Sequence, residues 1–186
     1  FEKKRKKFEI TFEYAKMQAL GGIWDSKDNG LRLDLFIKKV CNALEVTKDM
    51  VKRSELLGVY GNLSVKMFSN EDIILFKGIT ERASDANDIA AIVRTADIDW
   101  KLILEECRKQ SQERAWYGAL LDKLYEIKES HGIDAPITNE LQKLYDSTLL
   151  KEAYTTRHEK GMTHKQALGD LKKMGFKKKE LDWLTD

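Results

Sequence analysis

The sequence changes character at Ser69, and this change constrains the fold more than any other feature. Before it, short apolar runs alternate with turn residues, as where two such runs flank the turn sequence DSKDNG. After it, apolar residues recur at helical spacing, and the single proline of the chain, Pro136, lies in a short loop sequence. Because proline breaks helices, its scarcity suits a helix-rich chain. The pattern predicts an α+β protein whose second part is helical.

The first part of the chain is predicted to form a small mixed or antiparallel sheet with flanking helices. Two strands are expected at Ala19–Trp24 and Leu31–Lys38, because each is an apolar run bounded by turn residues. The Asn29-Gly30 pair between them favours positive φ, as a hairpin turn requires. A short helix is expected near Lys48–Glu55, followed by one or two further short strands.

Helices are expected in the rest of the chain. Ser69 and Asp72 form a start similar to a capping box, and Thr163 with Gln166 forms a second capping box. Further helices are predicted at Ile89–Arg94, Trp100–Gln110, Glu113–Ser130 and Asn139–Lys160, and as two short helices around Gly175. We therefore expect an α/β domain over residues 1–110 and a helical C-terminal region over residues 111–186.

Charge and cysteine content narrow the class of protein. Charged residues make up 34% of the chain, but the net charge is only +2, so it gives no argument for or against a nucleic-acid partner. Cys41 and Cys107 each lie alone in an apolar stretch, which favours reduced core thiols. No apolar run approaches the roughly 18 residues of a membrane span, and the N-terminus lacks the apolar core of a signal peptide. These features predict a cytoplasmic protein with no membrane partner.

Asp34 is the first candidate site residue. It lies in the strand sequence RLDLF, so its side chain is expected on the face opposite Leu33 and Leu35. Arg32 and Phe36 share its face, which places a charged pair beside an aromatic ring. A solvent-facing aspartate on an antiparallel strand also explains this pattern, so both interpretations stay open.

The segment SNEDIILFKGITERASDANDI, residues 69–89, carries the second set of candidates. Lys77, Arg82, Asp85 and Asp88 follow one another at short, regular intervals after an apolar helix face. Taken singly, the lysine is explained as a snorkelling side chain and the aspartates as acids favoured at a helix start. When these residues are considered together, Lys77 is a cation that faces the start of a second helix carrying Asp85 and Asp88. Such an arrangement is able to close a phosphate-binding cleft.

With these residues, the chain resembles a known family. The sequences RLDLF, SNEDIILFKGITERASDANDI and DIDW look like the archaeal branch of the nucleotidyltransferase-like proteins of the polymerase-β superfamily, related to the AbiEii toxins of type IV toxin–antitoxin systems. The resemblance covers about Leu31–Gln110 and, more loosely, the helical stretch to about Leu150. It implies a nucleotidyltransferase-like fold in which Asp34 binds metal, Lys77 contacts nucleotide phosphates, and Arg82, Asp85 and Asp88 organise the helix pair around the lysine.

The resemblance implies a Mg²⁺-dependent transfer of a nucleotide from an NTP to an RNA or protein acceptor. Carboxylates hold Mg²⁺ in such chemistry, and the metal neutralises phosphate oxygens. The superfamily also carries a glycine turn and an Asp-x-Asp strand upstream of the position of Asp34. The sequence LGGIWDSKD supplies Gly21-Gly22, but Asp25 and Asp28 lie in turn-like sequence and do not match that strand. Asp97 and Asp99 have the spacing but follow the lysine helix, where helix capping explains them.

The missing match to the Asp-x-Asp strand has two explanations, and each implies a different function. The first is that the metal-binding strand lies in residues that precede Phe1, and the protein is an active enzyme. The second is a catalytically inactive homologue that binds nucleic acid or a partner protein. Lysine-rich stretches at 3–7 and 172–179 could contact nucleic-acid phosphates in that case, although solvated helix ends explain them as well.

Overall fold

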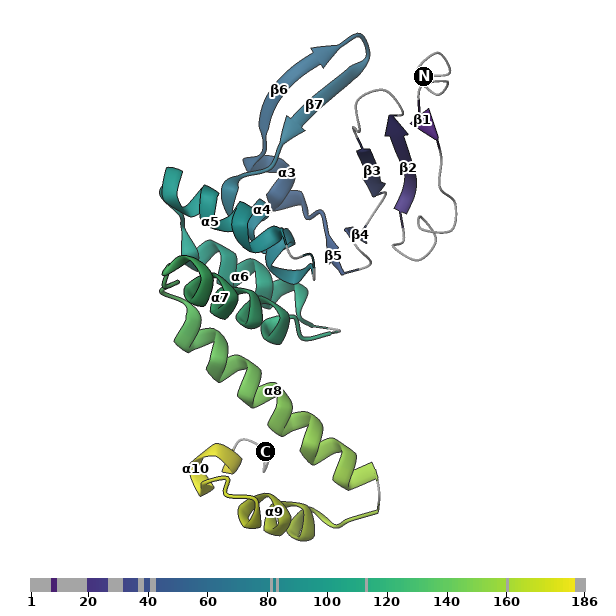
Figure 1. The fold of residues 1–186 in the computed structure, drawn as a ribbon. Helices are drawn as coiled ribbons and strands as arrows, with labels where there is room; N and C mark the ends of the chain where they lie inside the picture. Colours follow the sequence, from purple (N-terminus) through teal and green to yellow (C-terminus); the bar gives the residue numbers. More distant parts are fainter. Residues whose placement is uncertain are drawn as a thin grey trace. The chain divides into compact units, whose positions relative to one another are not determined.

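The fold of the described residues is α+β and mostly helical (Figure 1). In this computed structural model the described residues are 8–9, 20–26, 32–36, 39–40, 43–80, 82, 84–112, 114–159 and 161–182. Their contacts divide the chain into two compact units, Phe1–Pro136 and Ile137–Asp186.

Three small antiparallel sheets form the β part of the first unit within the described residues. Strands β1, β2 and β3 form one sheet in that order, β4 pairs with β5, and β6 pairs with β7. Their bounds are Phe8–Glu9, Leu20–Ser26, Arg32–Phe36, Lys39–Val40, Leu44–Glu45, Glu55–Tyr60 and Leu63–Met67 in chain order. The expected small sheet is therefore antiparallel wherever it is described.

The β2–β3 pair confirms the hairpin expected between residues 19 and 38. Ile23 of β2 lies opposite Asp34 of β3, and the register shifts between Leu20 and Gly22. The proposed turn at Asn29-Gly30 lies outside the described residues. Asp34 is thus a strand residue, as its apolar flanks predict.

The β6–β7 hairpin is the second clear strand pair. Tyr60 lies opposite Leu63, and the turn between them contains Gly61 at φ +64°. This left-handed conformation suits glycine, which has no Cβ to clash with the backbone. The register shifts between Leu56 and Gly58, so one residue of β6 bulges out of the ladder.

Five helices are described in the first unit. Their bounds are Lys48–Arg53 for α3, Asn70–Ile79 for α4, Asp85–Thr95 for α5, Trp100–Gln110 for α6 and Tyr117–His131 for α7. Helix α6 has the predicted bounds, whereas α5 begins before and α7 after the predicted residue, and α3 ends at Arg53 because Glu55 belongs to β6. The Ser69 hydroxyl accepts a hydrogen bond from the backbone N–H of Asp72 at 3.3 Å, which confirms the expected start of α4. Asp99 caps α6 by accepting bonds from the N–H groups of Lys101 and Leu102.

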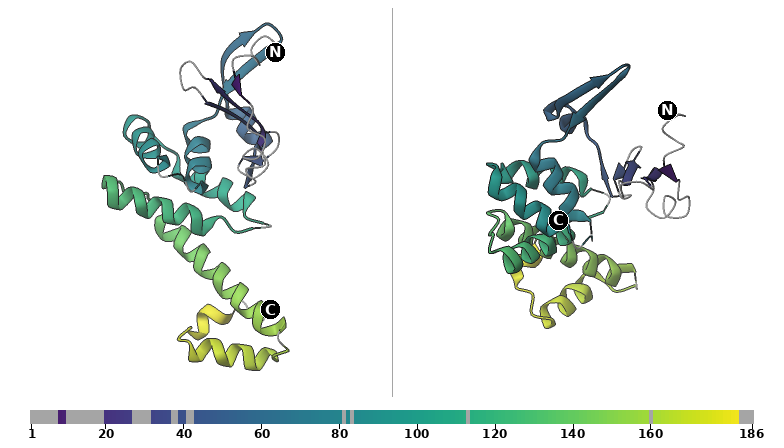
Figure 2. Two further views of the ribbon diagram at one scale, coloured as in Figure 1. Left: turned by 45° about the vertical axis from the view of Figure 1, so that its right-hand side comes forward. Right: turned by 45° about the horizontal axis from the view of Figure 1, so that its top comes forward.

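The core of the first unit lies where α4 packs against α5, α6 and α7 (Figure 2). Its fully buried side chains include Ile74, Leu75, Ile89, Ile103 and Leu120. Because α7 packs on α4 and α5, the compact unit continues to Pro136. The division by contacts therefore comes later than residue 110, where the sequence analysis ended the first domain.

A close helix contact at Gly78 makes a testable prediction. A Cβ at this position would lie 2.5 Å from Cδ1 of the buried Leu120. We expect Gly78→Ala to lower the free energy of unfolding by about 1 kcal/mol, because overpacking outweighs the gain in helix propensity. Gly169→Ala is the control, since its Cβ would meet nothing within 4 Å. Chemical denaturation should show stabilisation there, and equal stabilisation at both sites would contradict the close contact.

The described residues of the second unit form three helices. Helix α8 spans Thr138–Glu159, α9 spans His164–Lys173 and α10 spans Lys178–Leu181. Thr163 and Gln166 form the expected capping box of α9, and Gly175 at φ +101° lies between α9 and α10. Leu150, Leu171 and Leu181 form a small core that joins the three helices.

Among the described helices, none combines the length and the apolar character needed to cross a membrane. Cys107 of α6 is a free, fully buried thiol, as its apolar surroundings predict. Burial raises the pKa of this thiol to about 11. Cys41 lies outside the described residues.

The raised pKa of Cys107 predicts a thiol that is inert in the native state, because the thiolate is the reactive form. In a Cys41→Ser variant, Cys107 should react with iodoacetamide at pH 8 at least about 100-fold more slowly in the folded protein than in urea. Mass spectrometry of timed samples measures the rate. Equal rates in the two conditions would show that the side chain is accessible.

Candidate functional site

Lys77 lies at the centre of a polar cluster between α4 and α5. It belongs to the last turn of α4, and Asp85 and Asp88 belong to the first turn of α5. Its ammonium donates to an oxygen of Asp85 at 3.0 Å and to one of Asp88 at 2.6 Å. The structure thus brings together three of the residues singled out from the sequence. We call Lys77, Thr80, Asp85 and Asp88 the Lys77 cluster.

The two carboxylates of the Lys77 cluster differ in exposure. The side chain of Asp85 is 4% exposed and also accepts a hydrogen bond from the hydroxyl of Thr80. The side chain of Asp88 is 49% exposed. Asp85 is therefore a buried partner of Lys77, whereas the carboxylate of Asp88 is half exposed to solvent.

The Lys77 cluster keeps the lysine charged. Burial alone would lower the pKa of Lys77, but its hydrogen bonds to Asp88 and Asp85 outweigh that effect, and the pKa is raised above its ordinary value. A raised lysine pKa stabilises the fold below the unfolded pKa, and this contribution is lost as the pH rises through the folded pKa. The cation is thus present throughout the neutral range.

Helix geometry explains why the aspartates occur here. Both lie in the first turn of α5, where the helix dipole favours negative charge. The N-cap residue of α5 is Ser84, and Asp85 is the first residue of the helix. The side chain of Ser84 makes no capping hydrogen bond. Arg82, between the two helices, is exposed, and its backbone carbonyl accepts a bond from Lys123 of α7 at 3.4 Å.

Lys123 is a neighbour that the sequence analysis did not single out. It is a buried lysine of α7, 7% exposed, and it also pairs with Glu126 at 2.6 Å. Its contact with the carbonyl of Arg82 ties the loop between α4 and α5 to α7. The Lys77 cluster is therefore held in place on a packed scaffold of three helices.

Asp34 is described only as a backbone position of β3. Its side chain lies outside the described set, so its place relative to Lys77 stays a prediction. Among the described residues, no group of three or more His, Cys, Asp or Glu side chains is arranged to hold a metal ion. The oxygens of Asp85 and Asp88 face an ammonium, which occupies the place that a cation would take. The described residues thus do not form a Mg²⁺ site by themselves.

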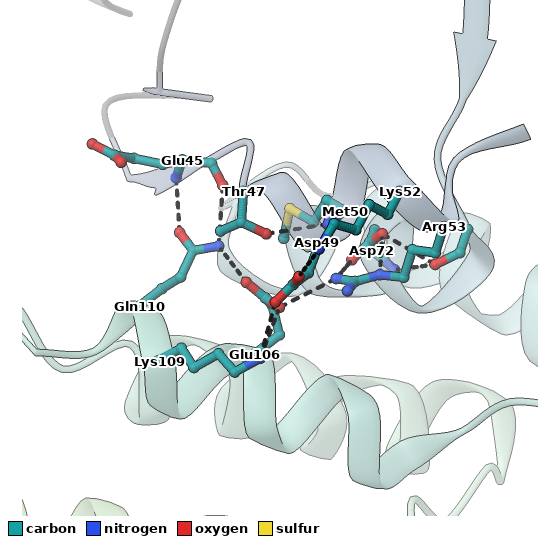
Figure 3. A network of polar contacts seen from close by, with 11 residues as sticks. Glu45, Thr47, Asp49, Met50, Lys52, Arg53, Asp72, Glu106, Lys109 and Gln110 are labelled. Carbon is teal, nitrogen blue, oxygen red and sulfur yellow. Dashed lines mark hydrogen bonds and ion pairs between the residues drawn. The ribbon is translucent and has the colours of Figure 1, made fainter.

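A second polar network lies deeper in the first unit (Figure 3). Arg53 of α3 donates through Nε to Asp72 of α4 at 2.7 Å, makes a second bond to the same carboxylate through Nη2, and reaches Glu106 of α6 at 3.2 Å. Asp72 and Glu106 are each 1% exposed. We call these three residues the Arg53 triad. It joins three helices, and the sequence analysis did not predict it.

Neighbouring residues extend the Arg53 triad to the surface. Gln110 donates to Glu106 at 3.3 Å and exchanges two hydrogen bonds with the backbone of Glu45 in β5. Lys109 pairs with Asp49 at 3.5 Å, and this pair lowers the pKa of the exposed Asp49. Figure 3 shows all of these side chains converging between α3 and α6. The arrangement satisfies its own charges, which is typical of a structural network.

The structure places Asp34 in a strand and brings Lys77, Asp85 and Asp88 together, but neither feature identifies a family. The family itself stays a prediction, because no family model, curated protein or solved structure matches the chain.

Proposed function

We propose that this chain is a nucleotidyltransferase-like protein that binds an NTP at the Lys77 cluster and transfers a nucleotide to an RNA or protein acceptor. The observation that carries the proposal is the convergence of Lys77, Asp85 and Asp88 from two helices, with the lysine held in its charged form. A lysine ammonium is a compact charge suited to phosphate oxygens. The side chain of Lys77 is 30% exposed, and that of Asp88 is 49% exposed.

Phosphate binding at this cluster requires an exchange of partners. Asp85 is buried and bonded to Thr80, so it would keep Lys77 in place. Asp88 is half exposed, and an exposed ion pair contributes only about 0–1 kcal/mol, so a phosphate oxygen is able to displace its carboxylate. Asp88 therefore acts as a placeholder for the phosphate, and Asp85 as the residue that positions the lysine.

In this proposal Mg²⁺ is the cofactor, held in part by Asp34. When bound, Mg²⁺ would neutralise charge on the phosphate oxygens. The chain's own residues supply the rest of the proposed chemistry: Lys77 orients the phosphates, and Asp85 with Thr80 fixes the lysine. Such positioning and charge stabilisation are the main protein contributions to phosphoryl-group chemistry.

A labelling assay tests the enzyme directly. The protein would be incubated with α-³²P-labelled NTPs, Mg²⁺ and total RNA or cell extract, and label transferred to any acceptor would be measured after gel electrophoresis. We expect Lys77→Ala and Asp34→Ala to reduce transfer at least about 100-fold, because each removes charge stabilisation of the reacting phosphate. The matched controls are Lys101→Ala and Asp97→Ala, which change exposed residues of the same types.

Two outcomes of this assay would contradict the enzyme. One is that the wild-type protein transfers no label to any acceptor with any of the NTPs. The other is that the Lys77→Ala variant transfers label as well as Lys101→Ala does. Circular dichroism of each variant would show whether it is folded, so that loss of transfer is not confused with loss of structure.

A second candidate function is a catalytically inactive homologue that binds nucleic acid or a partner protein. The observation that favours it is that Lys77 already has two carboxylate partners, an arrangement that also serves to join α4 to α5. In that case the wild-type protein would show no transfer but would bind RNA or a partner protein. The same preparation, tested by RNA gel shift and by affinity capture, separates the two candidates.

A further inference from the structure

The β6–β7 hairpin carries an unusual amount of exposed apolar surface. Six of its large apolar side chains are at least half exposed: Leu56 60%, Leu57 63%, Val59 61%, Tyr60 66%, Leu63 59% and Met67 50%. Figures 1 and 2 show the hairpin extending beyond α3 and α4. By the register of the ladder, Leu56 and Val59 project from the face opposite Tyr60, Leu63 and Met67, so the hairpin exposes apolar side chains on both of its faces. Exposed apolar surface of this kind marks an interaction site more often than a free surface.

The register of the hairpin shows which side chains share a face. Tyr60 lies directly opposite Leu63, and Met67 lies four residues further along the same strand, so all three project from one face. The Tyr60 ring lies over Gly58, because a Cβ on this glycine would be only 3.0–3.2 Å from ring atoms and the hydroxyl of the tyrosine. We call the face with Tyr60, Leu63 and Met67 the Tyr60 face.

The β6–β7 hairpin has little to stabilise it as an isolated pair of strands. Strands β6 and β7 pair with each other and with no other described strand. A single two-stranded hairpin is marginally stable in water unless its apolar face is covered. Proteins usually protect such strands from one another with charged residues, but from Leu56 to Val65 the sequence LLGVYGNLSV contains none.

The chemistry of the Tyr60 face selects one kind of partner. A nucleic acid would need cations, and the only charged residue whose register places it on this face is Glu55, an anion at its end. Apart from Glu55 at its end, the face is apolar, and an apolar face is able to pack against a copy of itself. Symmetric pairing of identical faces is the commonest form of protein oligomer. We propose that the Tyr60 face packs against the same face of a second copy of this chain.

The area of the Tyr60 face sets the strength of this dimer. Each of its large side chains exposes on the order of 100 Å², so each copy would bury roughly 400 Å² with the adjoining Val65 included. The two copies together then bury about 800 Å², which is at the low end for protein pairs and typical of a reversible complex. The dimer is therefore expected to dissociate on dilution, with a dissociation constant in the micromolar range.

Sedimentation velocity over about 1–200 μM protein tests this dimer. The wild-type protein should shift from monomer to dimer across the range, and Leu63→Glu should remain monomeric because two charges would be buried against each other. Ser64→Glu is the matched control: it adds the same charge at the next, exposed residue, on the opposite face, and should still dimerise. Circular dichroism confirms that both variants are folded.

Three results would overturn this dimer. The first is a wild-type protein that is monomeric at every concentration. The second is a dimer that Leu63→Glu and Ser64→Glu affect equally, which would place the contact elsewhere. The third is a monomer that sediments with lipid vesicles through the same hairpin, which would assign the Tyr60 face to a membrane surface. None of these measurements depends on nucleotide binding, so the dimer and the proposed transferase are tested separately.

Discussion

Arg53→Leu is expected to lower the free energy of unfolding by about 3–5 kcal/mol, because it leaves the buried carboxylate of Asp72 without a cation and that of Glu106 with only Lys109, at 4.0 Å. Asp72 and Glu106 are each only 1% exposed, and Arg53 is the cation that bonds to both. Without it, the two acids either stay charged in a poorly solvated place or take up protons. Urea denaturation followed by far-UV circular dichroism measures the change.

Lys52→Ala is the matched control for this prediction. Lys52 is adjacent in α3, but its side chain is 79% exposed and pairs with the exposed Asp49 at 3.6 Å. Its loss should change the free energy of unfolding by less than about 1 kcal/mol. If Arg53→Leu destabilises the protein no more than Lys52→Ala does, the Arg53 triad is not a buried structural network.

A triple variant separates charge from packing. In Arg53→Leu with Asp72→Asn and Glu106→Gln, no buried charge is left unpaired, so part of the lost stability should return. If the triple variant is less stable than Arg53→Leu alone, the hydrogen bonds of the carboxylates to Ser69 and Gln110 contribute more than their charges cost.

Changes at Lys77 and Asp88 are expected to move NTP affinity in opposite directions. Lys77→Met removes the cation, and a hydrogen bond to a charged group contributes about 1.5–3 kcal/mol, so binding should weaken roughly 10- to 100-fold. Asp88→Asn removes the carboxylate that competes with phosphate for Lys77, so binding should tighten up to about fivefold. Isothermal titration with each NTP in the presence of Mg²⁺ measures both effects.

The opposite signs distinguish a binding site from a structural ion pair. If the Lys77 cluster only joins α4 to α5, both variants should lower stability and neither should change NTP affinity. Asp122→Asn, which removes an exposed carboxylate from α7, controls for a general change of surface charge. Weaker binding by Asp88→Asn would contradict the role of its carboxylate as a placeholder for phosphate.

Local pattern was enough to predict most of the helices and one strand pair. The start of α4 at Ser69, the bounds of α6 and the capping box of α9 depend on residues three or four apart, which the sequence displays directly. The two compact units were harder to predict because their division depends on α7 packing against α4, a contact between segments far apart in the chain.

Among the polar sites too, contacts between residues close in sequence could be predicted and contacts between distant residues could not. Lys77 and Asp85 are only eight residues apart, so two short helices and one loop suffice to bring them together, and the spacing predicted their approach. Arg53 and Glu106 are 53 residues apart, and nothing local pairs them. One signal was present: Glu106 shares the buried face of α6 with Ile103 and Cys107, and a buried acid requires a cation.

Asp72 shows how a correct local interpretation can still be incomplete. Its backbone N–H bonds to Ser69, as a helix start predicts, yet its carboxylate serves the Arg53 triad. Position on α4 alone does not distinguish an acid that stabilises the helix end in solvent from one that is buried against a neighbouring helix.

The most direct test of the Lys77 cluster as a nucleotide site is a chemical-shift map by NMR. An NTP with Mg²⁺ would be titrated into ¹⁵N-labelled protein, and the shifts of the backbone amides would be followed. The account predicts that the largest changes lie between Lys77 and Asp88, at the end of α4 and the start of α5. Saturating NTP that leaves these amides unchanged, or that shifts only amides of other elements, would contradict it.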